Sequence, residues 1–176
     1  ANNKIASHWY YIFTTQAVQY LLGNGVSFKN DDTLDKLGKD FEKTIQDLAT
    51  DAKNSGVAFA YWNKDHIESF KYTEFAPIYD EETGQLASGI LFREYENELQ
   101  RIVLYEPDGD TEYIKRKGDS IKIYAEKRAY LLDTAQSINS GKIITGAKNY
   151  SRLPIFQLWN VNKQSDIIGN RETIDA

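Results

Sequence analysis

The stretch NNKIASHWYYIFTTQAVQYLLGNGVSF, residues 2–28, decides how the N-terminal part of the chain folds. Its apolar residues recur at steps of three and four, which predicts an amphipathic helix of about five turns held by tertiary contacts. Asn2 or Asn3 can cap the start of this helix, and Gly23 can end it in the left-handed conformation. The apolar stripe consists of Ile5, Trp9, Ile12, Phe13, Tyr20 and Leu21.

Gln16 lies on that same stripe. A buried amide without hydrogen-bond partners costs about 1–3 kcal/mol, so a glutamine at this position needs partners. A structural hydrogen bond, such as one that pins the sheet, is favoured over a contact between subunits. We therefore expect Gln16 to be buried and hydrogen-bonded within its own chain.

A second amphipathic helix is predicted after a polar loop at residues 29–32. A short strand at residues 26–28 precedes this loop. The helix runs as one piece to about Asn54, and Gly56 ends it. Its apolar stripe consists of Leu34, Leu37, Phe41, Ile45, Leu48 and Ala52.

From Val57 onward the pattern is typical of antiparallel strands. A turn at 63–65 should join strands at 57–63 and 67–79, and Pro77 should mark a sheet edge or a strand end. Further strands are predicted at 87–96, 98–106, 111–117 and 121–126, with the strongest turn signal at 107–110. Residues 129–150 lack a clear period and predict a loop with at most a short turn or strand. Residues 153–159 predict a buried strand.

The predicted fold class is therefore α+β. Two N-terminal helices should pack on a largely antiparallel or mixed sheet, and a C-terminal helix should begin near Ser165. The 176 residues, 41% hydrophobic and 27% charged, fit one globular domain. The absence of methionine and the first residue, Ala1, suggest a piece of a longer chain.

Composition also excludes several classes of function. The chain has no cysteine and only two distant histidines, which argues against disulfides, thiolate chemistry and a histidine zinc site. The net charge of −5 gives no general basic field for holding nucleic acid. No apolar run approaches the roughly 20 residues that span a bilayer, and no signal peptide opens the chain. A soluble, intracellular protein is expected.

Candidate chemistry is sparse. Asp108, together with Glu126 and the basic residues after it, resembles in part a metal-dependent nuclease, but a turn and a solvated strand face are the favoured interpretation. The segment from Asp108 lacks the glycine of a calcium loop, and Gly23-Asn24-Gly25 lacks the third glycine of a dinucleotide site. We predict no catalytic, cofactor-binding or metal-binding residue.

The opening stretch also resembles the signature at the start of the portal (connector) proteins of tailed bacteriophages of the siphophage type. Residues 76–80, APIYD, resemble a further segment of that family, and so does the helix ending at Gly56. Gly25, Ala17 and Val161 depart from the family pattern. The signature positions are Asn2, Asn3, Gln16, Tyr20, Gly23, Phe28, Gly56, Pro154, Asn160, Ser165, Asp166 and Asp175.

This resemblance implies a structural protein rather than an enzyme. Residues 1–164 would form a wing-like core, and residues 165–176 would begin a stem-like helix of a longer chain. The resemblance also implies a dodecameric ring at the capsid vertex, through which DNA is packaged and ejected without tight binding. Its partners would be copies of itself, the terminase, head-completion proteins, and scaffolding or capsid proteins, with no membrane. The protein would be made in the bacterial host cytoplasm and located in the virion. The alternatives are a small metal-dependent nuclease and another phage head-morphogenesis protein.

Overall fold

A computed structural model describes residues 9–29, 32–137 and 141–168 of the chain. The predicted α+β class is confirmed, with three α-helices and ten strands in the described residues. The helices are α1 (Trp9–Leu22), α2 (Asp32–Lys36) and α3 (Phe41–Ser55). The strands are β1 (Val57–Asn63), β2 (His66–Phe70), β3 (Phe75–Tyr79), β4 (Leu86–Tyr95), β5 (Leu99–Glu106), β6 (Gly109–Lys115), β7 (Lys122–Arg128), β8 (Leu131–Ser137), β9 (Gly141–Lys148) and β10 (Ile155–Trp159).

The chain divides into two compact units. Unit 1 consists of residues 1–72 and 155–176, and unit 2 of residues 73–154. Unit 1 is therefore discontinuous in sequence, because unit 2 is inserted between its strands β2 and β10. Every strand pair is antiparallel, and the strands form three separate sheets instead of the one sheet predicted.

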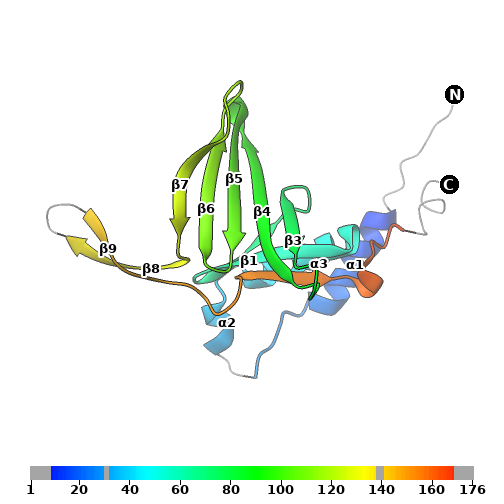
Figure 1. Ribbon diagram of the computed structural model, residues 1–176. Coiled ribbons are helices and arrows are strands. Elements are labelled where there is room, and N and C mark those ends of the chain that lie inside the picture. The colour runs from blue at the N-terminus through cyan, green and yellow to red at the C-terminus, as the bar shows by residue number, and fades with distance from the viewer. Residues whose placement is uncertain (1–8, 30–31, 138–140, 169–176) are drawn as a thin grey trace. The chain divides into compact units, whose positions relative to one another are not determined.

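In unit 1, helix α3 packs on a three-stranded sheet with the order β10-β1-β2 (Figure 1). Strand β1 lies in the centre, with Phe59 opposite Gln157 of β10 and Phe70 of β2. The predicted hairpin at Asn63–Asp65 is confirmed. The core between helix and sheet consists of Leu48, Ala52, Ala58 and Ala60, with Ile45 and Ile67 packed against it.

Helix α1 does not present the predicted stripe to the core. Its buried side chains are Thr14 and Val18, and α1 packs on α3. Gln16 is exposed, so the expectation that it is buried is wrong. The periodicity identified the helix but not its docking face, because a polar contact of Tyr10 with the end of α3 helps to orient it. The large apolar residues of α1 that are exposed are Tyr11, Ile12, Phe13, Tyr20 and Leu21.

The single helix predicted over residues 34–54 is divided into α2 and α3. Gly38 lies between them with φ +90°, and a Cβ there would meet the Cβ of His66 at 2.8 Å. The left-handed Gly38 follows the end of α2. The backbone N–H of Phe41 then donates a hydrogen bond to the Gly38 carbonyl where α3 begins. Residues 26–28 are not a strand but a connection without regular secondary structure. Gly38 therefore interrupts the predicted helix, although the spacing of the apolar residues continues across it without a break.

Unit 2 contains a five-stranded sheet with the order β3-β4-β5-β6-β7. The predicted hairpins of β4 with β5 and of β6 with β7 are confirmed, and Pro77 lies on the edge strand β3 as expected. The predicted strand over 67–79 is wrong. Residues 72–74 form a turn, so its two halves, β2 and β3, belong to different sheets.

A second difference in unit 2 concerns residues 129–150. Within this stretch β8 and β9 pair as antiparallel strands, where a loop was predicted. Tyr130, just before β8, is buried, and its hydroxyl donates to the carbonyls of Glu106 (2.7 Å) and Gly109 (3.1 Å). This tyrosine is held by backbone acceptors distant in sequence, which no local period reveals.

The C-terminal part of the chain is described as far as Ile168. Strand β10 occupies most of the predicted strand at 153–159, but of its residues only Ile155 is buried. Residues 166–168 form a turn. The remainder of the predicted C-terminal helix lies outside the described residues.

Candidate functional site at the end of helix α3

Helix α3 ends at Gly56, which has φ +86°. Its amide donates to the Ala52 carbonyl (2.7 Å), and its own carbonyl accepts the amide of Asn160 (3.0 Å). A Cβ at this position would approach the Lys163 carbonyl oxygen and the Gln164 carbonyl carbon, each at 3.1 Å. Gly56 therefore serves both the helix end and the close passage of the segment at residues 160–168.

Asp166 fixes that segment to the last turn of α3. Its carboxylate pairs with Lys53 Nζ (2.5 Å) and accepts Asn160 Nδ2 (2.6 Å), while its amide donates to the Lys53 carbonyl (2.9 Å). Asn160 Nδ2 also lies 2.8 Å from the Gln164 carbonyl. A cation near a helix C-terminus interacts favourably with the helix dipole, and here its charge also meets a carboxylate. The signature residues Gly56, Asn160 and Asp166 thus come together.

Two further residues complete this junction. The Ser165 hydroxyl accepts the Ile167 amide (3.2 Å), which starts the turn at 166–168. The Tyr10 hydroxyl of α1 donates to Asn54 Oδ1 (2.9 Å). We call this set of contacts among α1, the end of α3 and residues 160–168 the α3 junction. It holds residues 160–168 against the last turn of α3.

Burial alone would raise the pKa of Asp166, but its bonds with Lys53 and Asn160 outweigh burial and hold the pKa below its usual value. A carboxyl group whose pKa is lowered by folding stabilises the fold above its unfolded pKa and loses that contribution as the pH falls. We expect Asp166→Asn to lower the free energy of unfolding of unit 1 by roughly 1 kcal/mol or less at pH 7. Urea unfolding followed by tryptophan fluorescence measures this loss.

The difference between Asp166→Asn and the unaltered chain should shrink below about pH 4, as the Asp166 carboxylate takes up a proton and becomes neutral like asparagine. Asp35→Asn is a matched control, because Asp35 is an exposed carboxylate of the same unit. It should leave the unfolding curve unchanged. A difference for Asp166→Asn that stays constant with pH would show that the carboxylate charge does not stabilise the junction.

The other signature residues lie outside the junction. Gly23 ends α1, and its backbone N–H donates a hydrogen bond to the Gln19 carbonyl. Pro154 is buried just before β10. Tyr20 is 88% exposed, and Gln16 is exposed on the same helix. Asn2, Asn3 and Asp175 lie outside the described residues.

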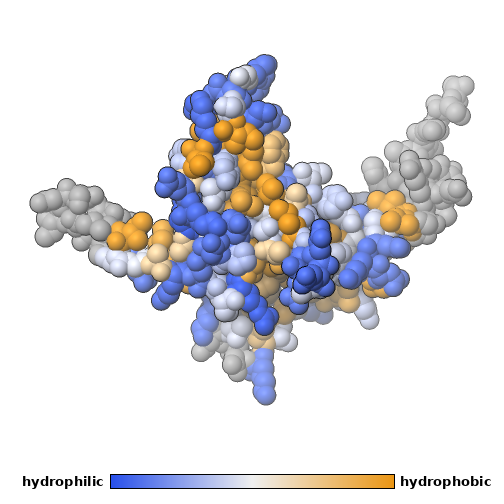
Figure 2. All heavy atoms as spheres, viewed as in Figure 1, coloured by the Kyte–Doolittle hydropathy of each residue, from blue (hydrophilic) through white to orange (hydrophobic). Residues whose placement is uncertain are grey.

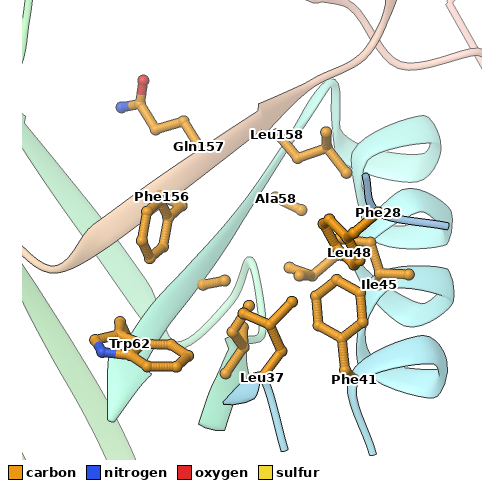
Figure 3. Close-up of a pocket in the computed structure, with 12 residues that line it drawn as sticks. Phe28, Leu37, Phe41, Ile45, Leu48, Ala58, Trp62, Phe156, Gln157 and Leu158 are labelled. Carbon is orange, nitrogen blue, oxygen red and sulfur yellow. The ribbon is translucent and has the colours of Figure 1, made fainter. Parts of the chain in front are cut away.

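Phe28 lines an apolar hollow on the surface of unit 1, with a volume of about 530 Å³ (Figure 3). Its ring contacts Phe41 at a centroid distance of 5.9 Å. The side chains of Phe156, Trp62 and Leu37 also border the hollow, whereas Gln157 points away from it. The hollow lies between α3 and the sheet, and a group bound there would make mainly apolar contacts. It does not provide the converging polar groups that catalysis needs.

A family model described as phage portal protein, SPP1 Gp6-like, matches residues 1–176. The chain belongs to this family of phage portal proteins. No curated protein matches the chain. The predicted portal resemblance is confirmed, and with it a structural role in the phage portal. The family is structural and non-enzymatic, and its place is the portal vertex of the capsid.

The carboxylates that suggested a nuclease do not converge in this portal chain. Asp108 is exposed and accepts Lys127 Nζ at 2.8 and 3.0 Å, and this bond lowers its pKa. Glu126 precedes Lys127 on β7, and successive side chains of a strand point to opposite faces. In the described part of the chain, no three His, Asp or Glu side chains gather in a way that could hold a metal ion.

An ion network with buried acids and partly exposed arginines joins three strands of the portal chain's five-stranded sheet. Glu112 of β6 is 3% exposed and accepts Arg101 Nη2 of β5 at 2.8 Å. Arg128 of β7 pairs with Glu112 and with Asp110 (3.3 Å). Burial raises the pKa of Asp110, although Arg128 acts in the opposite direction. The network ties three strands together and is a structural feature rather than a reactive one.

Sequence reasoning missed several residues of this portal chain's junction. Lys53 was not predicted to contact the C-terminal segment, and Tyr10 was not predicted to contact Asn54. The only local signal is a basic residue in the last turn of a helix. Within the described residues, no helix has both the length and the apolar composition needed to cross a membrane.

Proposed function

We propose that this chain forms the wing-like core of a portal subunit at residues 1–164 and the start of a stem-like helix at residues 165–176. Copies of the full-length subunit would form a dodecameric ring at the capsid vertex, through which DNA is packaged and ejected. The observation that carries the proposal is the family match over the whole chain. The α3 junction supports it, because it gives the chain a fixed exit from the core toward the proposed stem.

The proposed partners follow from this role. The subunit would contact copies of itself, the terminase, head-completion proteins, and scaffolding or capsid proteins. DNA would pass through the channel without tight binding, which agrees with a net charge of −5. The protein would be made in the cytoplasm of a bacterial host and incorporated into the virion.

Electron microscopy of the full-length protein containing this chain tests the proposal. We expect rings with a central channel, in particles whose mass matches twelve subunits. Chain 1–176 alone should be a monomer or a weak oligomer, because it contains only the start of the proposed stem-like helix. A full-length protein that remains monomeric at all concentrations would contradict the ring, and a stable large ring of chain 1–176 would contradict the assigned weak assembly.

A further inference from the structure

Two hairpins of opposite charge lie at one end of the five-stranded sheet of unit 2. Strands alternate in direction, so the turns of β4–β5 and β6–β7 are at the same end, which is hydrophilic in Figure 2. The β4–β5 hairpin is acidic and carries Glu94, Glu96 and Glu98. The β6–β7 hairpin is basic and carries Lys115, Arg116, Lys117 and Lys122.

Within one copy, the two hairpins already pair through Lys117 and Glu98. Lys122 is occupied by Asp119 of its own hairpin (3.3 Å). The other charges, Glu94, Glu96, Lys115 and Arg116, are exposed and have no ion pair among the described residues. One side of the sheet end thus has spare negative charge and the other has spare positive charge.

The basic side of the sheet also ends in an open strand. Strand β7 is last in the strand order, and it pairs with β6 alone in the described structure. Ile121, Ile123 and Tyr124 on or beside it are 56%, 62% and 67% exposed. Exposed edge strands with apolar side chains are rarely left uncovered in stable proteins.

On the acidic side, the last part of β4 is open as well. Strand β3 pairs with β4 only as far as Leu91, and one further bond joins the Phe92 amide to the Glu74 carbonyl. The segment Arg93–Tyr95 therefore has a strand partner on the β5 side alone among the described residues. Farther along this side, Pro77 of β3 lacks an amide donor and disfavours a longer added strand.

We propose that neighbouring copies of this chain meet side by side at this end of the sheet, with the basic β6–β7 hairpin of one copy against the acidic β4–β5 hairpin of the next. Lys115 and Arg116 face Glu94 and Glu96 across the contact. The exposed residues of β7 lose water against the open end of β4 in the next copy. This inference rests on the proposed ring and names the surfaces through which its subunits touch.

The topology supports this arrangement. Strands β4 and β7 run in opposite directions, because three antiparallel steps separate them. Two copies with the same orientation would therefore bring β7 of one copy antiparallel to β4 of the next, as in every other strand pair of the sheet. Such a head-to-tail contact uses two different surfaces of one subunit, and contacts of this kind generate closed rings when the rotation between copies permits.

Charge reversal on each hairpin separately tests the contact. Glu94→Lys with Glu96→Lys makes both hairpins basic, whereas Lys115→Glu with Arg116→Glu makes both acidic. We expect each double variant alone to lose self-association by tenfold or more in sedimentation velocity experiments up to millimolar concentration. An equimolar mixture of the two should associate again, because each basic hairpin then meets an acidic one. High salt should weaken association of the unaltered chain and of the mixture.

Matched controls separate this contact from the effect of net charge. Glu81→Lys with Glu82→Lys reverses two exposed acids of the β3–β4 turn, and Lys39→Glu with Lys43→Glu reverses two exposed bases of unit 1. Both should associate as the unaltered chain does, and circular dichroism should show that all variants are folded. Unchanged association of the hairpin variants, or no recovery in the mixture, would overturn the inference.

The same variants in the full-length protein distinguish this inference from the proposed function. If the unaltered protein forms rings and the reversed hairpins abolish them, both stand. Rings that persist in both hairpin variants would overturn the contact and leave the portal role intact. An unaltered protein without rings would overturn the proposed ring itself.

Discussion

The Phe59→Ala variant should lose about 3–5 kcal/mol of the free energy of unfolding of unit 1. Phe59 is 1% exposed at the centre of β1, and Phe59 and Phe70 are the largest fully buried side chains. Alanine would remove the buried ring and leave a cavity that the surrounding strands fill only in part. Because a domain is stable by only about 5–15 kcal/mol, the variant should be close to unfolded at physiological temperature.

Urea unfolding followed by tryptophan fluorescence measures this effect in unit 1 specifically. All three tryptophans of the chain, Trp9, Trp62 and Trp159, belong to unit 1, and residues 73–154 contain none. Phe156→Ala is the control, because Phe156 lies in the same sheet but is 54% exposed. It should cost roughly 1 kcal/mol or less. Equal losses for the two variants would show that Phe59 is not the centre of this core.

Gly56→Val should destabilise unit 1 by about 2–4 kcal/mol. Valine at φ +86° is strained, and its side chain would press on the backbone of Lys163 and Gln164. The strain lies where α3 ends and residues 160–168 pass, so the contacts of Asp166 with Lys53 should weaken as well. Tryptophan fluorescence in urea again measures the loss.

Gly84→Val separates the backbone strain from the crowding. Gly84 has φ +65°, but a Cβ at this turn would have nothing within 4 Å. The substitution should therefore lower the free energy of unfolding by roughly 1–2 kcal/mol, which is the strain of valine in the left-handed conformation alone. Unfolding followed by circular dichroism measures this loss. If Gly56→Val costs no more than Gly84→Val, the close passage of residues 160–168 does not contribute.

The elements that the sequence predicted correctly are those with strong local signals. The hairpins at Asn63–Asp65 and Pro107–Asp110 have turn residues that favour one backbone path, and Gly56 ends α3 as its position indicated. These signals act over a few residues and need no tertiary information. The portal family was also accessible from short motifs in their order along the chain.

The errors concern the relation of distant segments. The prediction that Gln16 is buried was wrong because a period of three and four identifies a helix but not the face that packs on its neighbour. The side chains that α1 buries are Thr14 and Val18, and Gln16 is exposed. The strands at 131–137 and 141–148 show only weak alternation of apolar and polar residues. Each is a strand because it pairs with the other, which neither segment reveals alone. The α3 junction joins residues 10, 53 and 166, and no pattern within one segment could have placed Lys53 beside Asp166.

The insertion of unit 2 between β2 and β10 has a consequence for the order in which the chain folds. Unit 2 is continuous in sequence, so its sheets can close as soon as residues 73–154 have left the ribosome. Strand β10 pairs with β1 across almost one hundred intervening residues, and this pairing must wait until residues 155–159 have been synthesised. A completed unit 2 shortens the effective loop between β1 and β10, because its own two ends are then fixed instead of being joined by a random chain. A folded unit 2 thus lowers the entropy cost of pairing β10 with β1 in unit 1.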